Sequence, residues 1–414
     1  MATTKATTLA HTLGGISSDI STAEINRLDG VTGDIQTLLN LKAPLASPTF
    51  TGTTTVADFV PATPLSHRNM IINGDFRVNQ AGPKTGKTGL EKQMTGDRWT
   101  INMSGFGTWS GGTEADTPTG SGFRNSSYLN CTSAQASPGA SAYCVYGQRF
   151  EGQDLQLIRK GTSSAKPITL SFWVKSPKTG IHICELYDGD NNRHCSQSYT
   201  IGTANTWEYN SVTFPADTTG AFDDDNDLSL YVQWWLGAGS NYTTGTLQTT
   251  WGTTTANRVV GQVNVADAVH STNNYWQVTG VQLELGSVAT PFEHKSYAEE
   301  LRRCERYYHV IAETNTNGKY IGMGYSYSAN YFTWVYNFPV VMRSAPIVKS
   351  STGSAYYYNY HNSTGTNYTT VPAGTRTNRC CVFDFSSTGS YTSGFAGGMY
   401  ISSASAYIHL DSEL

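Results

Sequence analysis

The stretch ITLSFWVKS at residues 168–176 is typical of a β-strand, because aromatic and β-branched residues fill most of its positions. Other strand-like runs lie in the same part of the chain: DRWTI (97–101), IHICELYD (181–188), TWEYNSVTF (206–214), LSLYVQWWL (228–236) and YWQVTGVQLELG (275–286). Turn-forming residues fill the intervals between these runs. Many short strands joined by turns predict a β-sandwich for residues 67–294.

The composition predicts an all-β protein. Of the 414 residues, 38% are hydrophobic and only 14% are charged, and Thr, Ser, Gly, Asn and Tyr replace the missing charges. Thr and Tyr favour strands, whereas Gly, Asn and Ser favour turns. The net charge of −4, with Lys and Arg scattered, argues against nucleic acid as a partner. We expect a soluble protein, since the sequence has neither a signal-peptide pattern nor an apolar run of about 18 residues.

The seven cysteines are an odd, scattered set, which favours free thiols in a reducing compartment over a disulfide framework. His182, Cys184, His194 and Cys195 are residue types that bind zinc. A hairpin turning at Gly189 and Asp190 explains them without a metal and would place Cys184 opposite Cys195. We therefore expect no metal and no cofactor.

The N-terminal region has a helical pattern with a narrow apolar stripe. Leu28, Val31, Ile35 and Leu38 recur at spacings of three and four, after a capping box at residues 21–24. A helix this short is marginal alone, and no neighbouring globular sequence is available for it to cover. We expect the stripe to associate with copies of itself; an ordinary amphipathic helix is the alternative.

The segment STAEINRLDGVTGDIQTLLNLKAPLASPTFTGT, residues 21–53, resembles the shaft of bacteriophage tail fibre proteins. In that family three chains wind together at this segment. The resemblance implies a homotrimer made in the host cytoplasm and assembled into the virion. Residues 1–66 would then form a short helical and β shaft that attaches to a phage tail, baseplate or adaptor protein.

The rest of the chain resembles other parts of such fibres. NMIINGDFRV (69–78), LSFWVKS (170–176) and WQVTGVQLELGSVATPFE (276–293) resemble jelly-roll modules of the carbohydrate-binding kind. YAEELRRCERYYHV (297–310) has helical composition and predicts a connector over 295–312, with its charges on a solvated helix face. FPVVMRSAPIV (338–348) resembles the small terminal domain of the same fibres, which implies a C-terminal β-sandwich domain at 313–414.

The terminal domain carries the candidate binding residues. It is rich in Tyr, whose rings suit both sugar stacking and packing between chains. We expect Tyr325, Tyr327, Trp334 and Tyr357 to present exposed rings to a host-surface glycan or outer-membrane protein. The alternative is that such rings belong to the core or to a trimer interface.

Three other chemistries carry less support. AGPKTGKTG (81–89) fits a relaxed phosphate-loop pattern but lacks the strand before it and the helix after it, so we expect a basic surface loop and no nucleotide. Asp223, Asp225 and Asp227 are weak calcium candidates in a charged turn. No catalytic pair of carboxylates or nucleophile motif is evident, so we expect receptor binding and no enzymatic activity. A polysaccharide depolymerase and a purely structural spacer remain the alternatives.

Overall fold

A computed structural model of the chain describes residues 66–253, 255–267, 274–313, 318–372, 374–388 and 391–414. The chain divides into two compact units, residues 1–61 and 62–414. The predicted stripe of Leu28, Val31, Ile35 and Leu38 lies outside the described residues. In the described part, no helix is both long enough and apolar enough to cross a membrane.

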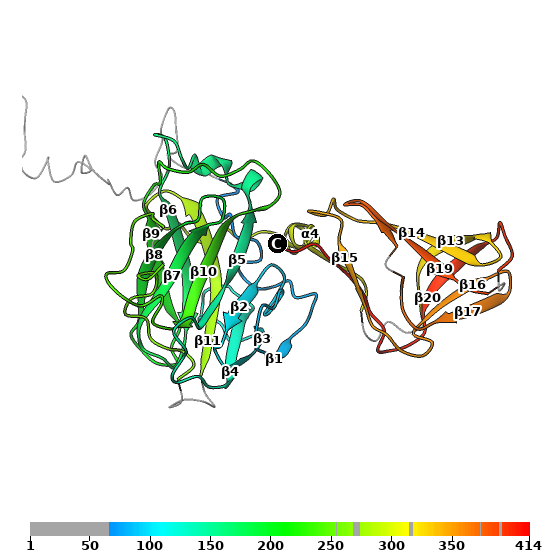
Figure 1. Cartoon of the computed structure of the whole chain (residues 1–414), viewed down its shortest axis with the longest axis horizontal. Helices are drawn as coiled ribbons and strands as arrows, with labels where there is room; N and C mark the ends of the chain where they lie inside the picture. The colour runs from blue at the N-terminus through cyan, green and yellow to red at the C-terminus, as the bar shows by residue number, and fades with distance from the viewer. Residues whose placement is uncertain (1–65, 254, 268–273, 314–317, 373, 389–390) are drawn as a thin grey trace, which may run out of the picture. The chain divides into compact units, whose positions relative to one another are not determined.

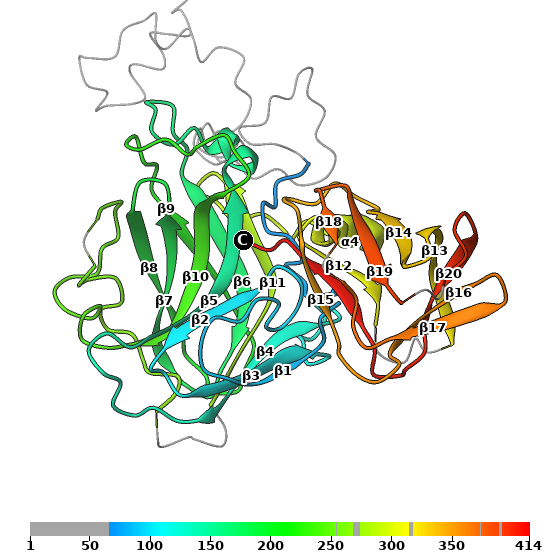
Figure 2. The same cartoon turned by 45° about the vertical axis from the view of Figure 1, so that its right-hand side comes forward.

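Two antiparallel sheets form the body of the second unit (Figures 1 and 2). The six-stranded sheet has the order β1 (Lys84–Lys87), β3 (Thr108–Glu114), β4 (Ser126–Ser133), β11 (Tyr275–Leu285), β6 (Ile168–Lys175) and β9 (Glu208–Phe214). The five-stranded sheet has the order β2 (Thr100–Ser104), β5 (Tyr143–Glu151), β10 (Leu228–Ala238), β7 (Gly180–Asp188) and β8 (Arg193–Ile201). Two 3₁₀ turns, η1 (Gly152–Asp154) and η2 (Gln156–Ile158), follow β5. The predicted β-sandwich is therefore confirmed, and the described part of the chain is nearly all β.

The core lies between these two sheets and follows the two-residue period of a strand. Along β10, the side chains of Leu230, Val232 and Trp234 enter the core, and all are fully buried. Phe172 of β6 meets Trp234 edge to face, with ring centroids 5.3 Å apart. Each buried aromatic or aliphatic side chain contributes about 1.5–3 kcal/mol, so this alternation holds the sheets together.

The hairpin of β7 and β8 has a different register from the one expected. Residues 189–192 connect the strands, so Cys184 pairs with Gln197 while Cys195 pairs with Leu186. The expectation that Cys184 faces Cys195 was wrong, because the loop is two residues longer than a two-residue turn at Gly189 and Asp190. All seven cysteines are free thiols, six of them buried.

The phosphate-loop lookalike is not a loop throughout. Lys84–Lys87 forms edge strand β1, which pairs with β3. The Nζ atom of Lys87 lies 2.9 Å from a carboxylate oxygen of Glu91. Lys87 would be the phosphate-binding cation of a phosphate loop, but here it is already paired with a carboxylate. No helix follows this strand, so the segment lacks the helix N-terminus on which phosphate binding depends.

A short helix and a three-stranded sheet follow the body. Helix α4 (Tyr297–Glu305) begins after Ser296, whose side chain accepts a hydrogen bond from the Glu299 amide. The connector is helical only as far as Glu305. Aromatic and β-branched residues then form β12 (Tyr308–Ala312), which pairs with β21 (Ile408–Asp411), and β21 pairs with β15 (Ile347–Ser350).

The charges of α4 are not confined to a solvated face, contrary to expectation. The buried Glu300 carboxylate accepts a hydrogen bond from the Asn73 amide, with an N–O distance of 2.6 Å. Arg306, just after the helix, binds both carboxylate oxygens of the fully buried Glu151. These contacts reach across the sequence and fix the helix to the body.

The last residues of the chain return to the body. Arg98 and Glu413 form an ion pair in which both side chains are almost completely buried. The Arg98 guanidinium also lies over the Tyr307 ring, 3.4 Å from its centroid. Arg149 donates a hydrogen bond to the Leu414 carbonyl oxygen at 2.8 Å. The C-terminal residues are therefore fixed to the body by a buried ion pair and by a hydrogen bond from Arg149.

Candidate receptor-binding surface

A seven-stranded antiparallel sheet fills most of the terminal region. Its order is β17 (Thr364–Tyr368), β16 (Tyr357–His361), β20 (Ala396–Ile401), β13 (Lys319–Ser328), β14 (Tyr331–Asn337), β19 (Cys380–Ser386) and β18 (Thr375–Arg376). One face of this sheet packs on a core that contains Phe332, Phe383 and Met399. Because successive side chains of a strand point to opposite faces, the other face carries a different set of residues.

Trp334 lies on the buried face, so the expectation of an exposed ring was wrong. Only 1% of Trp334 is exposed, and its ring stacks on Phe383 with centroids 4.9 Å apart. Gly322 on the neighbouring strand makes room for it: a Cβ atom there would lie 2.1 Å from the indole nitrogen. Because Gly322 has no side chain, the Trp334 indole can occupy this space in the core.

Tyr357 is also fully buried, which contradicts its predicted exposure. Its hydroxyl donates to the Tyr407 carbonyl oxygen at 2.8 Å and lies 2.9 Å from the Ser351 hydroxyl. In the run Tyr356-Tyr357-Tyr358, strand β16 begins at Tyr357 and directs that ring inward. The ring completes the core instead of meeting a ligand.

The outward face carries the exposed tyrosines. Tyr325 and Tyr327, the other two predicted residues, are 50% and 48% exposed. The Tyr327 ring lies parallel to Tyr331, with centroids 5.5 Å apart. We call this surface the tyrosine face and define it by the outward residues of β13, β14, β16 and β20: Tyr320, Met323, Tyr325, Tyr327, Tyr331, Val335, Tyr358, Tyr360 and Tyr400.

Two rings of the tyrosine face lie across glycines. A Cβ atom on Gly398 would lie 2.5 Å from the Tyr320 ring, and one on Gly365 would overlap the Tyr358 hydroxyl. Both glycines are therefore covered by a ring from a neighbouring strand, an arrangement known to stabilise glycines in sheets. Tyr320 remains 62% exposed, because a bulge between Tyr320 and Gly322 keeps it on the outward face. The sequence analysis did not select these two residues.

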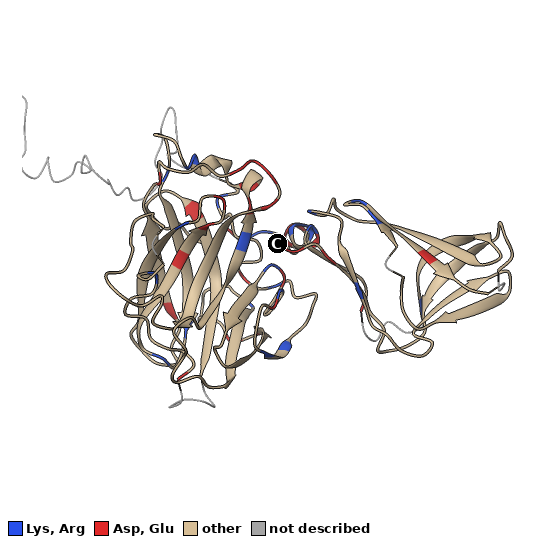
Figure 3. Cartoon of the chain, viewed as in Figure 1, with Lys and Arg blue, Asp and Glu red and all other residues tan. Residues whose placement is uncertain are grey.

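The tyrosine face carries almost no charge. The strands of this sheet contain only three charged residues, Lys319, Arg376 and Asp384, and Figure 3 shows them otherwise free of blue and red. Desolvation and the charge of Asp384 raise the pKa of Tyr327, so its hydroxyl remains neutral at neutral pH. An uncharged surface of aromatic rings with hydroxyl groups suits a neutral ligand that offers both C–H faces and hydroxyls.

The aromatic side chains on the outer face of the body's five-stranded sheet are covered and do not offer a binding surface. The outward side chains of its five-stranded sheet include Tyr231 and Trp235, which are only 6% and 2% exposed. Arg258, from the segment after β10, lies over the Trp235 ring at 5.1 Å and forms an ion pair with the fully buried Glu185. Arg258 and its described neighbours after β10 thus cover this sheet, and no sequence pattern predicted this cover.

The calcium candidates do not assemble into a site. Asp223, Asp225 and Asp227 are exposed, and Asp227 lies 3.4 Å from Arg343. One carboxylate oxygen of Asp225 accepts a hydrogen bond from the Asp227 amide instead of facing a shared centre. Within the described ranges, no group of three or more His, Cys, Asp or Glu is placed to hold a metal ion.

Comparison with known proteins gives only distant structural similarity. No protein-family profile and no curated protein matches the sequence. The structure is similar to the enzymatically active domain of bacteriophage CBA120 tailspike protein 4, with 14% identity and a TM-score of 0.29 over 52% of this chain and 21% of that one. The match therefore spans about a fifth of the tailspike chain.

Two carbohydrate-binding modules are similarly distant. A family 11 module of a Clostridium thermocellum cellulosomal cellulase matches with 12% identity and a TM-score of 0.24, over 51% of this chain and 99% of the module. A family 61 module in complex with β-1,4-galactotriose matches with 9% identity and a TM-score of 0.25, over 53% and 99%. Scores this low support no conclusion about what this chain binds.

Proposed function

We propose that this protein is a phage tail fibre protein that binds a host-surface glycan through the tyrosine face. The observation that carries the proposal is the combination of exposed tyrosine rings, two of them laid across glycines, on a sheet face with almost no charge. Sugar rings have apolar C–H faces bordered by hydroxyls, and tyrosine offers a flat ring with a hydroxyl at its edge.

The terminal region is favoured over the body as the binding part because of the side chains that each leaves exposed. Arg258 and its neighbours cover the aromatic side chains on the five-stranded sheet of the body. The tyrosine face has no such cover in the described part of the chain, and Tyr320, Tyr325 and Tyr360 are between 43% and 62% exposed. A ligand reaches these rings without displacing any described segment.

Weak contacts suffice in such a protein. The proposed trimer, assembled through residues 1–66, would present three tyrosine faces, and several fibres on one virion would multiply them. The partners of the proposal are therefore a second and third copy of the chain, a tail or baseplate component, and the host glycan. Binding proceeds without hydrolysis in this proposal, and no cofactor takes part.

The test compares two tyrosines of equal exposure. Tyr325→Ala removes a ring of the tyrosine face, whereas Tyr209→Ala removes a 49% exposed ring from the outer face of the body's six-stranded sheet. Loss of one stacking ring costs about 0.5–1.5 kcal/mol, so we expect Tyr325→Ala to weaken each site about 2- to 10-fold. Tyr209→Ala should bind like the unchanged protein.

Binding is measured on immobilised bacterial surface polysaccharides and by blocking phage adsorption to host cells, with the melting temperature as a check on folding. If both variants bind equally, the tyrosine face is not the binding surface. Release of reducing sugar from the same polysaccharides would support a depolymerase, and silence in every binding assay would support a structural spacer.

A further inference from the structure

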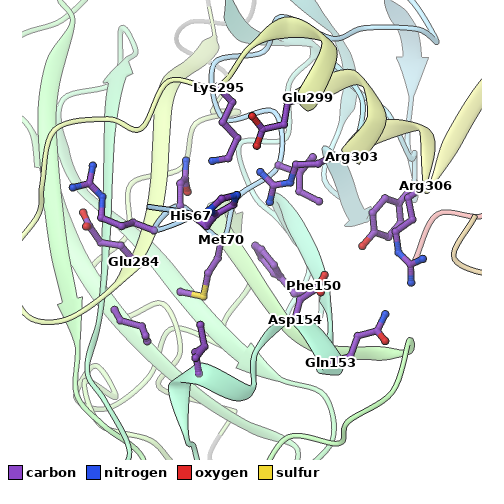
Figure 4. Close-up of a pocket in the computed structure, with 16 residues that line it drawn as sticks. His67, Met70, Phe150, Gln153, Asp154, Glu284, Lys295, Glu299, Arg303 and Arg306 are labelled. Atoms are coloured by element: carbon purple, nitrogen blue, oxygen red, sulfur yellow. The ribbon is translucent and has the colours of Figure 1, made fainter. Parts of the chain in front are cut away.

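A cavity lies on the body, and none of its lining residues belongs to the tyrosine face. It has a volume of about 400 Å³ and opens between the segment that begins at His67, the end of β5, the 3₁₀ turns and helix α4. Figure 4 shows His67 and Met70 at its centre, Lys295, Glu299 and Arg303 along one side, and Phe150 and Asp154 across from them. Its volume falls at the small end of the range for ligand pockets.

The cavity has an apolar part. Met70, Phe150 and Leu157 line it, and Leu157 is 64% exposed although it is a large aliphatic side chain. An exposed leucine at the edge of a pocket loses unfavourable contact with water when a ligand covers it. This part of the cavity suits the C–H face of a ring.

Some of the charged groups around the cavity are already engaged in the fold. Arg306 makes two hydrogen bonds to Glu151. Both carboxylate oxygens of Glu284 accept hydrogen bonds from Thr290, and one also accepts from Gln282. These groups hold the walls together, so we do not assign them to a ligand.

Other cationic groups retain donors. The guanidinium of Arg303 lies 3.7 Å from Glu300, and its hydrogen bond to the Ile71 carbonyl oxygen is long at 3.4 Å. Arg68 donates from Nη2 to the Pro291 carbonyl oxygen, but its buried Nε has no hydrogen-bond partner. Lys295 makes an ion pair with Glu293 at 3.0 Å and has three donors in all.

His67 also lines the cavity. Its backbone φ of 53° lies in the left-handed region, which a non-glycine residue seldom occupies. This conformation places the imidazole in the cavity, near Arg303 in Figure 4.

We infer that this cavity binds a sugar residue that carries a carboxylate group. Arg303 and Lys295 meet the carboxylate, and Met70, Phe150 and Leu157 receive the C–H face of the ring. Asp154 and Glu299 offer acceptors to the hydroxyls, which distinguishes this ligand from a fully ionised phosphate. The cavity shares no residue with the tyrosine face. Refuting this inference would therefore leave the proposed function untouched, and the reverse is also true.

The experiment uses the full chain and three probes: D-glucuronate, D-glucose and inorganic phosphate. Saturation-transfer NMR should detect the binding of glucuronate. Titration should give a dissociation constant in the millimolar range, as expected for so small a ligand. Glucose should bind at least about tenfold more weakly, because a hydrogen bond to a charged group contributes about 1.5–3 kcal/mol. Phosphate should not displace glucuronate at equal concentration.

Two variants and a control on the same helix test the residues. Arg303→Gln should weaken glucuronate binding at least about tenfold, whereas Arg302→Gln, which does not line this cavity, should leave it unchanged. Leu157→Asp places a repelling charge at an exposed position and should abolish binding even if Arg303→Gln disturbs the fold. Equal binding of glucose and glucuronate, displacement by phosphate, or no binding by the unchanged protein would each overturn the inference, whatever Tyr325→Ala does.

Discussion

The buried pair of Arg98 and Glu413 should be among the most sensitive points of the molecule. Glu413→Gln keeps the shape of the side chain and removes its charge, while the Arg98 guanidinium stays buried at 1% exposure. Burial already lowers the pKa of Arg98, which indicates how unfavourable its charge is at this position. Removing one partner of a buried pair costs about 3–5 kcal/mol, and the lower value applies here because Gln retains a hydrogen-bond acceptor.

The assay is thermal unfolding together with hydrogen exchange. A loss of about 3 kcal/mol corresponds to a fall in melting temperature of roughly 5–10 °C for a domain of this size. If only the end of the chain detaches, the loss appears instead as faster exchange of the Ser412 amide, which donates to the Tyr307 carbonyl oxygen at 2.8 Å. The control is Lys349→Gln: Lys349 is 46% exposed, and the buried Asp411 carboxylate keeps its hydrogen bond from the Glu413 backbone amide, so this change should cost less than about 1 kcal/mol.

A double variant separates lost charge pairing from lost packing. Arg98→Met with Glu413→Leu replaces the pair by apolar side chains of similar length and should recover most of the stability lost in Glu413→Gln. The reasoning is refuted if Glu413→Gln changes neither the melting temperature nor the exchange of Ser412, or if the double variant is less stable than the single one.

Three further predictions concern the rest of the molecule. Burial lowers the pKa of His182, His309 and His409 from an ordinary value of 6.5 to about 4. Their neutral forms therefore stabilise the fold above pH 6.5, and this stability is lost as the pH falls from 6.5 to 4. His309→Gln should make the fall in melting temperature across this pH range shallower. Cys380 is the one half-exposed thiol among the seven cysteines, so a thiol reagent should modify one site per folded chain quickly and all seven after denaturation. Lys87→Ala should change the free energy of unfolding by less than about 1 kcal/mol, as measured by denaturant titration, because its contact with Glu91 is partly exposed.

The strands of the body could be predicted because their residues are typical of strands and their turns are rich in Gly, Asn and Ser. The residue types did not predict which face of each strand points into the core. Trp334 is buried because Gly322, on another strand, leaves room for its indole and Phe383 stacks on it, whereas Tyr325 points to the opposite face of the sheet. That information lies in pairing between distant segments, and strand propensity does not contain it.

The same limit explains the other differences. The register of β7 and β8 depends on a loop length that no single turn motif specified. The cover over the five-stranded sheet depends on Arg258 meeting Glu185, two residues 73 positions apart. The cavity at His67 combines segments separated by more than 200 residues, so it becomes visible only when the chain is folded.

The pairing of β12 with β21 has a consequence for how such a protein can vary. Tyr308 pairs with Asp411 and His309 pairs with Leu410, so the chain leaves the three-stranded sheet and returns to it along adjacent strands. Everything between Ala312 and Ile408, including the tyrosine face, is an insertion whose two ends are already held side by side. A replacement segment would have to supply its own partner for β21, as β15 does here, and its own contact with the body, as Arg343 does by hydrogen bonding to Asn226. The binding specificity proposed for the tyrosine face could therefore be exchanged together with this segment, while the two sheets of the body stay unchanged.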